Sequence, residues 1–389
     1  MTRRSKILSS IGALFALLLI SMMVRLTHND SCGAPPPLAA NLPFMKAMVY
    51  RCYGAPRVVK LENLEKPRPA PDRVLVKVAA AAVNPLDWHY LKGEPYLMRA
   101  ASGLGTPSDI RLGVDFAGTV EAVGSRVTRY KPGDRVFGGA DGSFAEYVTP
   151  RAEGSMALLP DNVSFEQAAA LPIAGVTALQ ALRDKGHVQP GMNVLINGAS
   201  GGVGTYAVQI AKLMGARVTG VCSTRNLAMV RSIGADKVVD YTREDFTRLA
   251  DRYDLIIDNV GTHTQSEYGR VLTPTGTVIM VGGVNCSVCL GPLFSWLGDS
   301  MMAHFTTQKR LRFLAELNAG DLAQLGAWMA EGKLTSVIDR KYALTDVPAA
   351  LGYLEQGHAR GKVLIDLTAA VPEPADVALV RSAPASSHP

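Results

Sequence analysis

A glycine-rich turn between an apolar run and a helical pattern constrains the fold of this 389-residue chain more than any other feature. The run Val194–Ile196 leads into residues 198–204, GASGGVG, and apolar residues at helical spacing follow up to Leu213. A strand, a glycine turn and a helix in this order form the context of a dinucleotide-binding fingerprint, whereas the alternative is an ordinary tight turn. Small residues let the backbone approach a pyrophosphate, and the helix N-terminus offers it N–H groups. The residues predicted to hold the pyrophosphate are Ala199, Ser200, Gly201, Gly202, Val203 and Gly204.

The end of the next apolar run, Arg217–Cys222, indicates which dinucleotide is bound. A fold that binds NAD usually carries a carboxylate about twenty residues beyond the glycines, where it holds the ribose hydroxyls. Here Ser223 and Arg225 stand at that position, and no carboxylate accompanies them. A hydroxyl and a guanidinium suit a 2′-phosphate, so the sequence favours NADP(H) over NAD(H). Taken alone, Arg225 is equally typical of a solvated arginine at a helix start.

Short β-branched runs alternate with helical segments from residue 193 to residue 282, which predicts a doubly wound parallel sheet. Ligands of such sheets lie beyond the carboxyl ends of the strands. Small residues at two of these ends would let a nicotinamide ribose approach, although plain turn chemistry explains them equally well. They are Asn259, Val260, Gly282 and Gly283.

Charge and cysteine content exclude several classes of function. The formal net charge is +6, but the first 44 residues hold four basic residues against one acidic residue. No basic cluster with interleaved aromatic residues follows, so no nucleic-acid partner is expected. The five cysteines suggest no disulfide framework and fit a reducing compartment. The lone pair Cys286 and Cys289 is most typical of two ordinary thiols, with a redox dithiol as the alternative.

The N-terminus differs from the rest of the chain. Residues 7–24 carry no charge and follow Arg3, Arg4 and Lys6, so residues 1–30 predict a membrane anchor or a signal segment. Residues 31–44 are typical of a linker. The positive-inside rule would export the remainder, which conflicts with a need for cytosolic NADPH. An inverted topology, true export and a cytoplasmic product that begins near residue 45 remain alternatives to the membrane-associated interpretation.

The first folded half, from residue 45 to about residue 160, has short strands with frequent turns and predicts a partly barrel-shaped β domain. After a helix expected around Leu311–Trp328, strands return up to Leu367 and complete this domain. The predicted organisation is a nucleotide-binding domain inserted into a β domain, followed by a disordered tail. The predicted boundaries are 45–167 and 309–367 for the β domain, 168–308 for the nucleotide-binding domain, and 368–389 for the tail.

Eight segments occur in an order that resembles a known superfamily. They are MKAMVYRCYG (45–54), VNPLDWH (83–89), LGVDFAGTVEAVG (112–124), GDRVFG (133–138), GSFAEYV (142–148), GVTALQAL (175–182), NGASGGVG (197–204) and GKVLIDL (361–367). From 45 to 368 the chain resembles a medium-chain dehydrogenase/reductase of the zinc-free quinone oxidoreductase, or zeta-crystallin-like, branch. This resemblance implies an α/β fold with a Rossmann sheet inserted in a GroES-like β domain, and a homodimer.

The resemblance also shows which metal ligands are missing. Zinc alcohol dehydrogenases of this superfamily have a cysteine at the position of Asn84 and a His-Glu pair at Val114-Asp115. They also carry a four-cysteine lobe, which this chain lacks. A catalytic zinc needs three ligands of the His, Cys or carboxylate kind, so we expect no metal. His89 is more typical of a local hydrogen-bonding histidine than of a ligand.

A reductase without a Lewis acid needs a hydride acceptor that is already activated, such as a quinone or an α,β-unsaturated carbonyl compound. The predicted function is NADPH-dependent reduction of such an acceptor, with simple aldehyde or alcohol chemistry and a non-catalytic redox sensor as alternatives. Predicted catalytic residues are Asn84, Tyr53 and Tyr90. The resemblance adds Thr177, Tyr241 and Lys362 to the cofactor site. Asn84 is also typical of a turn before a proline, and Tyr53 of simple packing. Residues 91–110 and 285–303 are expected to set the substrate.

Overall fold

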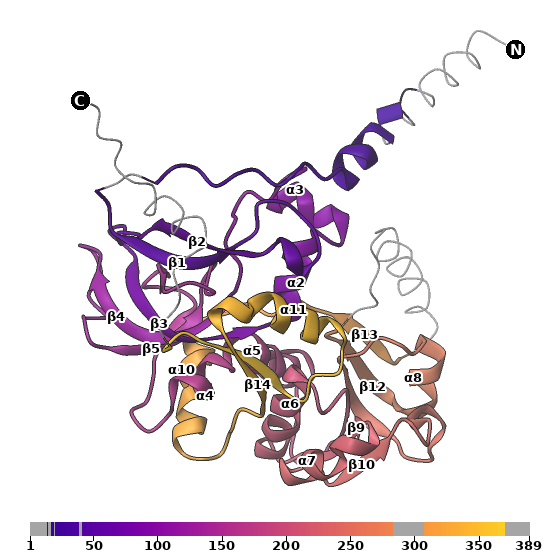
Figure 1. Ribbon diagram of the computed structural model, residues 1–389. Coiled ribbons are helices and arrows are strands. Elements are labelled where there is room, and N and C mark those ends of the chain that lie inside the picture. The colour runs from indigo at the N-terminus through magenta and orange to yellow at the C-terminus, as the bar shows by residue number, and fades with distance from the viewer. Residues whose placement is uncertain (1–13, 15–16, 19, 39–40, 283–306, 370–389) are drawn as a thin grey trace, which may run out of the picture.

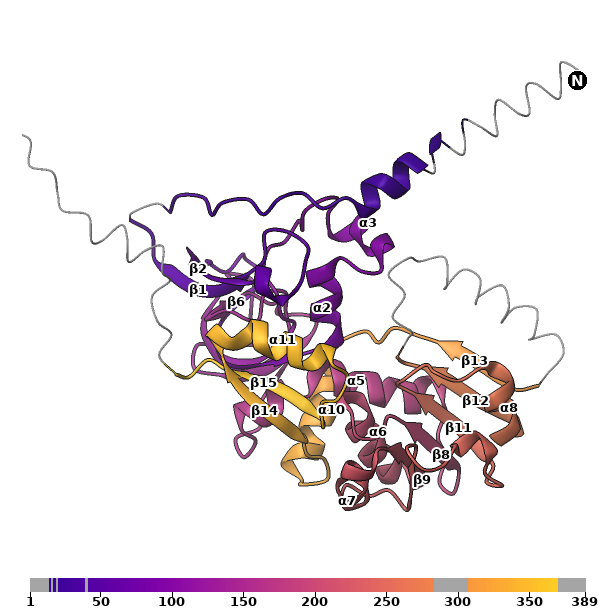
Figure 2. The same cartoon turned by 45° about the vertical axis from the view of Figure 1, so that its right-hand side comes forward.

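The structure, a computed structural model, describes the chain except residues 1–13, 15–16, 19, 39–40, 283–306 and 370–389 (Figure 1). Two main sheets lie side by side, with the N-terminal helix projecting away from both (Figures 1 and 2). The predicted α/β fold is confirmed, since one sheet is parallel with helices packed on it and the other is mixed and mostly antiparallel.

The parallel sheet contains six strands in the order β10-β9-β8-β11-β12-β13. Its central strands are continuous apolar runs, as expected for strands covered by helices on both faces. The strands are β8 (Asn193–Asn197), β9 (Arg217–Cys222), β10 (Lys237–Asp240), β11 (Tyr253–Asp258), β12 (Leu272–Met280) and β13 (Lys309–Arg312). The associated helices are α5 (Pro172–Gln180), α6 (Gly202–Leu213), α7 (Leu227–Ser232) and α8 (Gln265–Val271), and a π-helical turn, η3 (Ala181–Lys185), extends α5.

The second sheet has the order β14-β15-β3-β4-β5-β7, with β6 paired to β3, and a separate β1-β2 hairpin lies against it. Its strands are β3 (Val74–Val83), β4 (Asp115–Val123), β5 (Arg135–Gly139), β6 (Tyr147–Val148), β7 (Met156–Leu158), β14 (Ile338–Ala343) and β15 (Lys362–Asp366), and the hairpin is β1 (Phe44–Val49) and β2 (Lys60–Glu65). The helices of this domain are α2 (Pro85–Lys92), α3 (Arg99–Ser102), α4 (Phe165–Ala169), α10 (Ala319–Ala330) and α11 (Val347–Glu355). Short 3₁₀ turns are η1 (Pro56–Val58), η2 (Tyr96–Met98), η4 (Thr224–Asn226), η5 (Phe246–Arg248) and η6 (Leu344–Asp346).

The position at which the chain returns from the parallel sheet to the β domain differs from the predicted one. Strand β13 pairs with β12 in the parallel sheet, so the chain leaves that sheet after Arg312 rather than at residue 308. The helix expected around Leu311–Trp328 begins only at Ala319. The sequence Lys-Arg-Leu-Arg of β13 lacks an apolar run because, among the described strands, β13 lies at the edge of the sheet, where Lys309 and Arg312 are exposed.

The two domains share one apolar core. A single cluster of buried side chains includes Ala80 and Phe137 of the β domain together with Leu179 and Ile210 of the helices on the parallel sheet. Because this core is continuous, the parallel sheet and the β domain pack as one body rather than as units joined only by the chain. Residues that come from both domains can therefore form one fixed site.

The N-terminal segment requires a correction. Cys32 and Cys52 form a disulfide, a single pair that the sequence, read as having no disulfide framework, did not lead us to expect. Spacing could not reveal this pair, since its two members meet only where residues 28–38 pass over the β domain (Figure 1). The predicted anchor, residues 7–24, lies partly outside the described residues, and residues 20–27 are helical. Within the part that the structure describes, no helix is long and apolar enough to cross a bilayer.

Candidate functional site

The glycine turn connects β8 to α6 through a backbone that only small residues can follow. Gly198 has φ +74°, and a Cβ on Gly204 would lie 2.1 Å from the carbonyl oxygen of Gly198. Residues 200–203 are half-buried, at the N-terminus of α6. The first N–H groups of a helix have no partner within it, so the turn presents them as a site for an anion.

A second glycine position supports the same interpretation. A Cβ on Gly282, after β12, would lie 2.1 Å from the carbonyl oxygen of Asn259, after β11. Gly198 itself faces Val260, whose side chain is 42% exposed. The ends of β8, β11 and β12 thus approach one another through backbone, as a bound dinucleotide requires. Gly283 lies outside the described residues.

The end of β9 carries polar groups without a carboxylate. Asn226 is 3% exposed, and its Nδ2 donates to Ser200 Oγ (3.1 Å) and Ser223 Oγ (3.3 Å). Its Oδ1 has no partner in the described part of the chain, so an acceptor is left beside the glycine turn. The exposed guanidinium of Arg225 donates to the carbonyl oxygen of His358. Tyr241, which follows β10, is 58% exposed.

One carboxylate does lie near the end of β9, on the neighbouring strand. Asp240 accepts hydrogen bonds from the hydroxyls of Thr224 (2.5 Å) and Thr242 (2.8 Å). The Thr224 hydrogen bond is the main reason why the pKa of Asp240 is below its usual value. Because these hydroxyls occupy its oxygens, Asp240 is poorly placed to hold a ribose in the way that NAD-binding carboxylates do.

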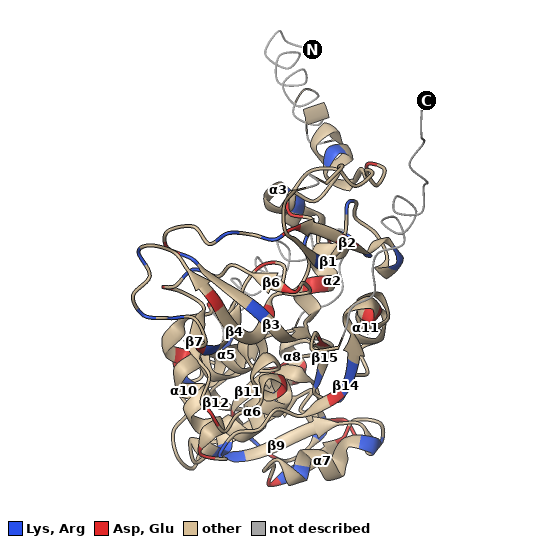
Figure 3. Cartoon of the chain, turned by 60° about the vertical axis from the view of Figure 1, so that its left-hand side comes forward, with Lys and Arg blue, Asp and Glu red and all other residues tan. Residues whose placement is uncertain are grey.

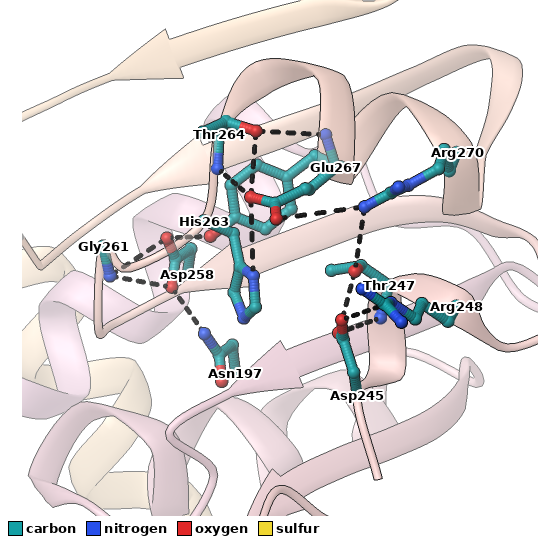
Figure 4. A network of polar contacts seen from close by, with 11 residues as sticks. Asn197, Asp245, Thr247, Arg248, Asp258, Gly261, His263, Thr264, Glu267 and Arg270 are labelled. Atoms are coloured by element: carbon teal, nitrogen blue, oxygen red, sulfur yellow. Dashed lines mark hydrogen bonds and ion pairs between the residues drawn. The ribbon is translucent and has the colours of Figure 1, made fainter.

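Figure 4 shows how a buried carboxylate fixes the loop after β11. Asp258 is fully buried and accepts from Asn197 Nδ2 (2.9 Å), from the N–H groups of Val260 (3.0 Å) and Gly261 (3.1 Å), and from the Tyr268 hydroxyl. Burial, and then the charge of Asp258, raise the pKa of Tyr268. A carboxylate only accepts, so four donors can converge on it. Since Asn197 precedes the glycine turn, Asp258 links the two loops predicted to hold the cofactor.

A second buried polar group lies between the domains, and we call it the buried polar cluster: Asn84, Asp87, Asp115 and Lys362. Lys362 Nζ lies 2.5 Å from Asn84 Oδ1 and 3.3 Å from Asp115 Oδ2, and Asn84 Nδ2 donates to Asp115 Oδ2 (2.9 Å). Asp87 Oδ2 accepts from the Asn84 N–H (2.7 Å), which caps α2. All four side chains are at most 3% exposed.

The buried polar cluster contacts both the start of α5 and the glycine turn. Asp115 Oδ1 accepts from the N–H of Ile173, near the start of α5 (3.0 Å). Gly361, which precedes Lys362, donates its N–H to the Ser200 carbonyl oxygen (2.8 Å), and the Lys362 stem lies against Gly202. The β domain therefore reaches the predicted phosphate site through Gly361 and Lys362.

Burial changes the protonation of the two carboxyls in the cluster. It raises the pKa of Asp87 to about 7, against opposing hydrogen bonds from the N–H groups of Asn84 and Gly113 and the charge of Lys362. Burial also raises the pKa of Asp115, although Lys362 and the Asn84 amide oppose that shift. Desolvation disfavours a charged carboxylate, and only one cation in the cluster compensates two of them.

The three predicted catalytic residues differ in whether their polar groups already have hydrogen-bond partners. Both ends of the Asn84 amide are engaged within the buried polar cluster. The Tyr53 hydroxyl donates to the Gly103 carbonyl oxygen (2.7 Å), and the ring is 4% exposed. Tyr90 is half-buried, and its hydroxyl has no hydrogen-bond partner in the described part of the chain. Thr177 is half-buried on α5. Of the three predicted catalytic side chains, only Tyr90 keeps a free polar group.

Sequence reasoning missed two features. One is the buried carboxylate of Asp258, and the other is that the carboxyls of Asp87 and Asp115 are buried together, each in contact with Asn84. Asp258 ends the apolar run Tyr-Asp-Leu-Ile-Ile-Asp, and a carboxylate directly after a buried strand is a signal that could have found it. His89 contacts the Glu94 carbonyl oxygen through Nδ1 (2.7 Å), which is the local role expected for it. Among the described residues, no three His, Cys, Asp or Glu side chains gather in a way that could hold a metal. The absence of a metal stays a prediction.

Comparison with known proteins gives the same organisation. Residues 70–161 match the family described as alcohol dehydrogenase GroES-like domain, and residues 233–365 match the family described as zinc-binding dehydrogenase. The 2-methylene-furan-3-one reductase of Solanum lycopersicum is 35% identical over 336 residues, which are 82% of this chain and 79% of that protein. The chloroplastic NADPH-dependent alkenal/one oxidoreductase of Arabidopsis thaliana is 34% identical, with the same two coverages.

A solved structure extends the likeness to three dimensions. The Escherichia coli quinone oxidoreductase complexed with NADPH has a TM-score of 0.71 and 26% identity, covering 82% of this chain and 99% of that one. Fold and matched families together define a medium-chain dehydrogenase/reductase. The chain belongs to that superfamily, and within it to the quinone oxidoreductase branch, as the sequence resemblance predicted.

Proposed function

We propose that this protein is an NADPH-dependent reductase that transfers hydride to a quinone or an α,β-unsaturated carbonyl compound. The observation that carries the proposal is the combination of the glycine turn with a β9 end that offers the Ser223 hydroxyl and the exposed Arg225 guanidinium instead of a carboxylate. The relatives support it, since their names describe an enone reductase, an NADPH-dependent alkenal/one oxidoreductase and an NADPH-bound quinone oxidoreductase.

The residues around the glycine turn fit NADPH, which supplies the hydride when bound. The α6 N-terminus and residues 199–204 would hold the pyrophosphate, and Arg225 would pair with the 2′-phosphate. Tyr241 offers an exposed ring for the adenine. The loop fixed by Asp258 would place Asn259 and Val260 beside the nicotinamide ribose. The remaining members of the proposed cofactor site are Thr177, Ser223, Gly282, Gly283 and Lys362.

The acceptor must then tolerate negative charge without a metal. A quinone or a conjugated carbonyl spreads that charge over an extended π-system, so the protein needs only to orient the acceptor and to stabilise the oxyanion. Tyr90 is the proposed proton or hydrogen-bond donor, because its hydroxyl is free of partners among the described residues. Asn84 and Lys362 act as positioning residues in this proposal, since their polar atoms hold one another.

The test is steady-state oxidation of NADPH with a panel of quinones, a panel of enones and a panel of saturated aldehydes. We expect turnover with at least one of the first two panels, none with the third, and a strong preference for NADPH over NADH. Tight NADPH binding without turnover on any panel would contradict the proposal and indicate a non-catalytic sensor. Activity-linked zinc in the purified protein would contradict the metal-free mechanism.

We further propose two features of assembly. The uncharged residues 7–24 tether the protein to a membrane, supported by the basic residues on both sides of this stretch. Two chains pair through the parallel sheet, supported by the edge position of β13 among the described strands. Fractionation with protease protection tests the tether, and light scattering of detergent-solubilised protein tests the dimer. Recovery of the full-length chain in the soluble fraction, or a monomer at micromolar concentration, would contradict them.

A further inference from the structure

The end of the N-terminal helix and the residues that follow it, up to the disulfide, are held against the β domain. We call residues 24–33 the strap. Its first attachment is the disulfide between Cys32 and Cys52. Its second is backbone pairing, in which Asp30 donates its N–H to the Gly105 carbonyl oxygen (3.1 Å). The third is Leu26, an apolar side chain of the strap that is 6% exposed.

Arg99 provides the fourth attachment. Its side chain is 1% exposed, and Nη1 donates to the strap carbonyl oxygens of Leu26 (3.0 Å) and His28 (3.1 Å). Nε and Nη2 donate to the carbonyl oxygens of Gly93 and Lys92 (both 2.9 Å), at the end of α2. A guanidinium presents its donors in a rigid planar fork, so one side chain joins two segments that are remote in sequence.

The same guanidinium lies over the ring of Tyr53, 4.3 Å from its centroid. The Tyr53 hydroxyl in turn contacts Ser102 Oγ and the Gly103 carbonyl oxygen. The strap, the end of α2, α3 and the loop up to residue 105 are therefore one connected unit. The N-terminal helix is therefore fixed to this face of the β domain by several contacts.

Large apolar side chains close to this unit in the sequence are exposed. Leu97 and Leu104 are 66% and 52% exposed, and they lie two residues from Arg99 and one residue from Gly105 in the chain. The adjoining helix exposes seven more, each between 39% and 63%: Leu14, Leu17, Leu18, Ile20, Met22, Met23 and Val24. Scattered exposed leucines need no explanation, but seven exposed apolar side chains on one helix, joined to a unit that exposes Leu97 and Leu104, do.

We propose that the strap docks the β domain on an anionic lipid bilayer through the face that carries Leu97 and Leu104, an inference that rests on the proposed tether. A bilayer is the occupant that fits, because an uncharged stretch is flanked by Arg3, Arg4 and Lys6 on one side and Arg25 on the other. Apolar side chains enter the acyl boundary while basic side chains meet lipid phosphates. The strap fixes which face turns to the lipid, and a flexible linker would not.

Hydrogen–deuterium exchange of the full chain tests this docking, with and without vesicles of phosphatidylcholine and phosphatidylglycerol. With vesicles, we expect exchange of the amides of residues 93–105 to slow about fivefold or more. Reduction of the disulfide should weaken this protection while the protein stays bound, because the strap then loses one of its four attachments and the tether is unchanged. Binding without protection of residues 93–105 would overturn the docking and leave the tether intact.

Substitution of the exposed leucines gives the second measurement. The double variant Leu97→Asp/Leu104→Asp should weaken vesicle binding about tenfold or more, since two apolar contacts are replaced by charges that anionic lipid repels. The control is Leu158→Asp, which alters a residue that is 51% exposed on β7, away from α3 (Figure 3). Equal affinities for the double variant and the control would overturn the proposal. Turnover of NADPH with a water-soluble acceptor in detergent is measured in parallel, so failure of the catalytic proposal is recognised separately.

Discussion

The glycine turn and the buried polar cluster lie next to each other but are built in different ways. The turn is shaped by backbone, and its essential feature is the absence of side chains at Gly198 and Gly204. The buried polar cluster is shaped by side chains, with one lysine serving two carboxyls. An added side chain would disrupt the glycine turn, whereas the loss of one side chain would leave the other members of the buried polar cluster without their partner. The two therefore fail under opposite kinds of substitution.

Lys362→Met is the most severe test of the side-chain site. It leaves Asp115 and Asp87 buried without a cation, and breaking a buried ion pair in this way costs about 3–5 kcal/mol of unfolding free energy. Urea denaturation measures the loss. The matched control is Lys341→Met, which removes an exposed ion pair with Glu166 and should cost less than about 1 kcal/mol. If Lys362→Met and its control cost the same, the cluster does not depend on its lysine.

Gly204→Ala tests the backbone site. The new methyl group would lie 2.1 Å from the Gly198 carbonyl oxygen, so the turn must move, and a displaced phosphate site should raise the NADPH KM about 100-fold. Gly352→Ala on α11 is the control, because a Cβ there meets nothing within 4 Å. Titration of NADPH by fluorescence separates lost binding from lost turnover. An unchanged KM would mean that the cofactor does not contact this turn.

The contrast between the two sites also explains what the sequence could predict. The glycine turn, the parallel sheet and the absence of a carboxylate after β9 are local features, which spacing alone predicts. The partners of Lys362 come from the end of β3 and from β4, more than 240 residues away, and no local pattern predicts such contacts. The same holds for Arg99 and for Cys32, whose partners lie across the fold. The edge strand β13 was missed because it lacks the apolar run by which strands are recognised.

The variant Asp87→Asn tests the buried polar cluster through the pH dependence of the protein's stability. The folded-state pKa of Asp87, about 7, is above its ordinary value of 3.8, so the folded protein holds a proton that the unfolded chain has lost. This group makes the protein less stable as pH rises between about 4 and 7, by at most about 1.4 kcal/mol per pH unit.

The Asp87→Asn variant keeps an acceptor for the Asn84 N–H but cannot titrate at this position, so its stability should fall less over this range. Urea midpoints at pH 5 and pH 7 for both proteins measure the difference, and Asp115, which is coupled to Asp87, titrates in both. Parallel pH profiles for wild type and variant would show that Asp87 is ionised throughout and that the cluster carries an unbalanced charge.

Arg225→Ala should have the smallest effect, because it removes an exposed contact rather than a buried one. Loss of one charge-assisted hydrogen bond to a 2′-phosphate should raise the NADPH KM about tenfold and leave the NADH KM unchanged. The control is Arg243→Ala, an exposed arginine that pairs with Asp240. Since the guanidinium of Arg225 already contacts the His358 carbonyl oxygen, stability should change little and the effect should appear in cofactor selectivity. An equal rise in KM for both cofactors would place Arg225 outside the phosphate site, and selectivity would then depend on the uncharged donor of Ser223, because the Thr224 hydroxyl already donates to Asp240.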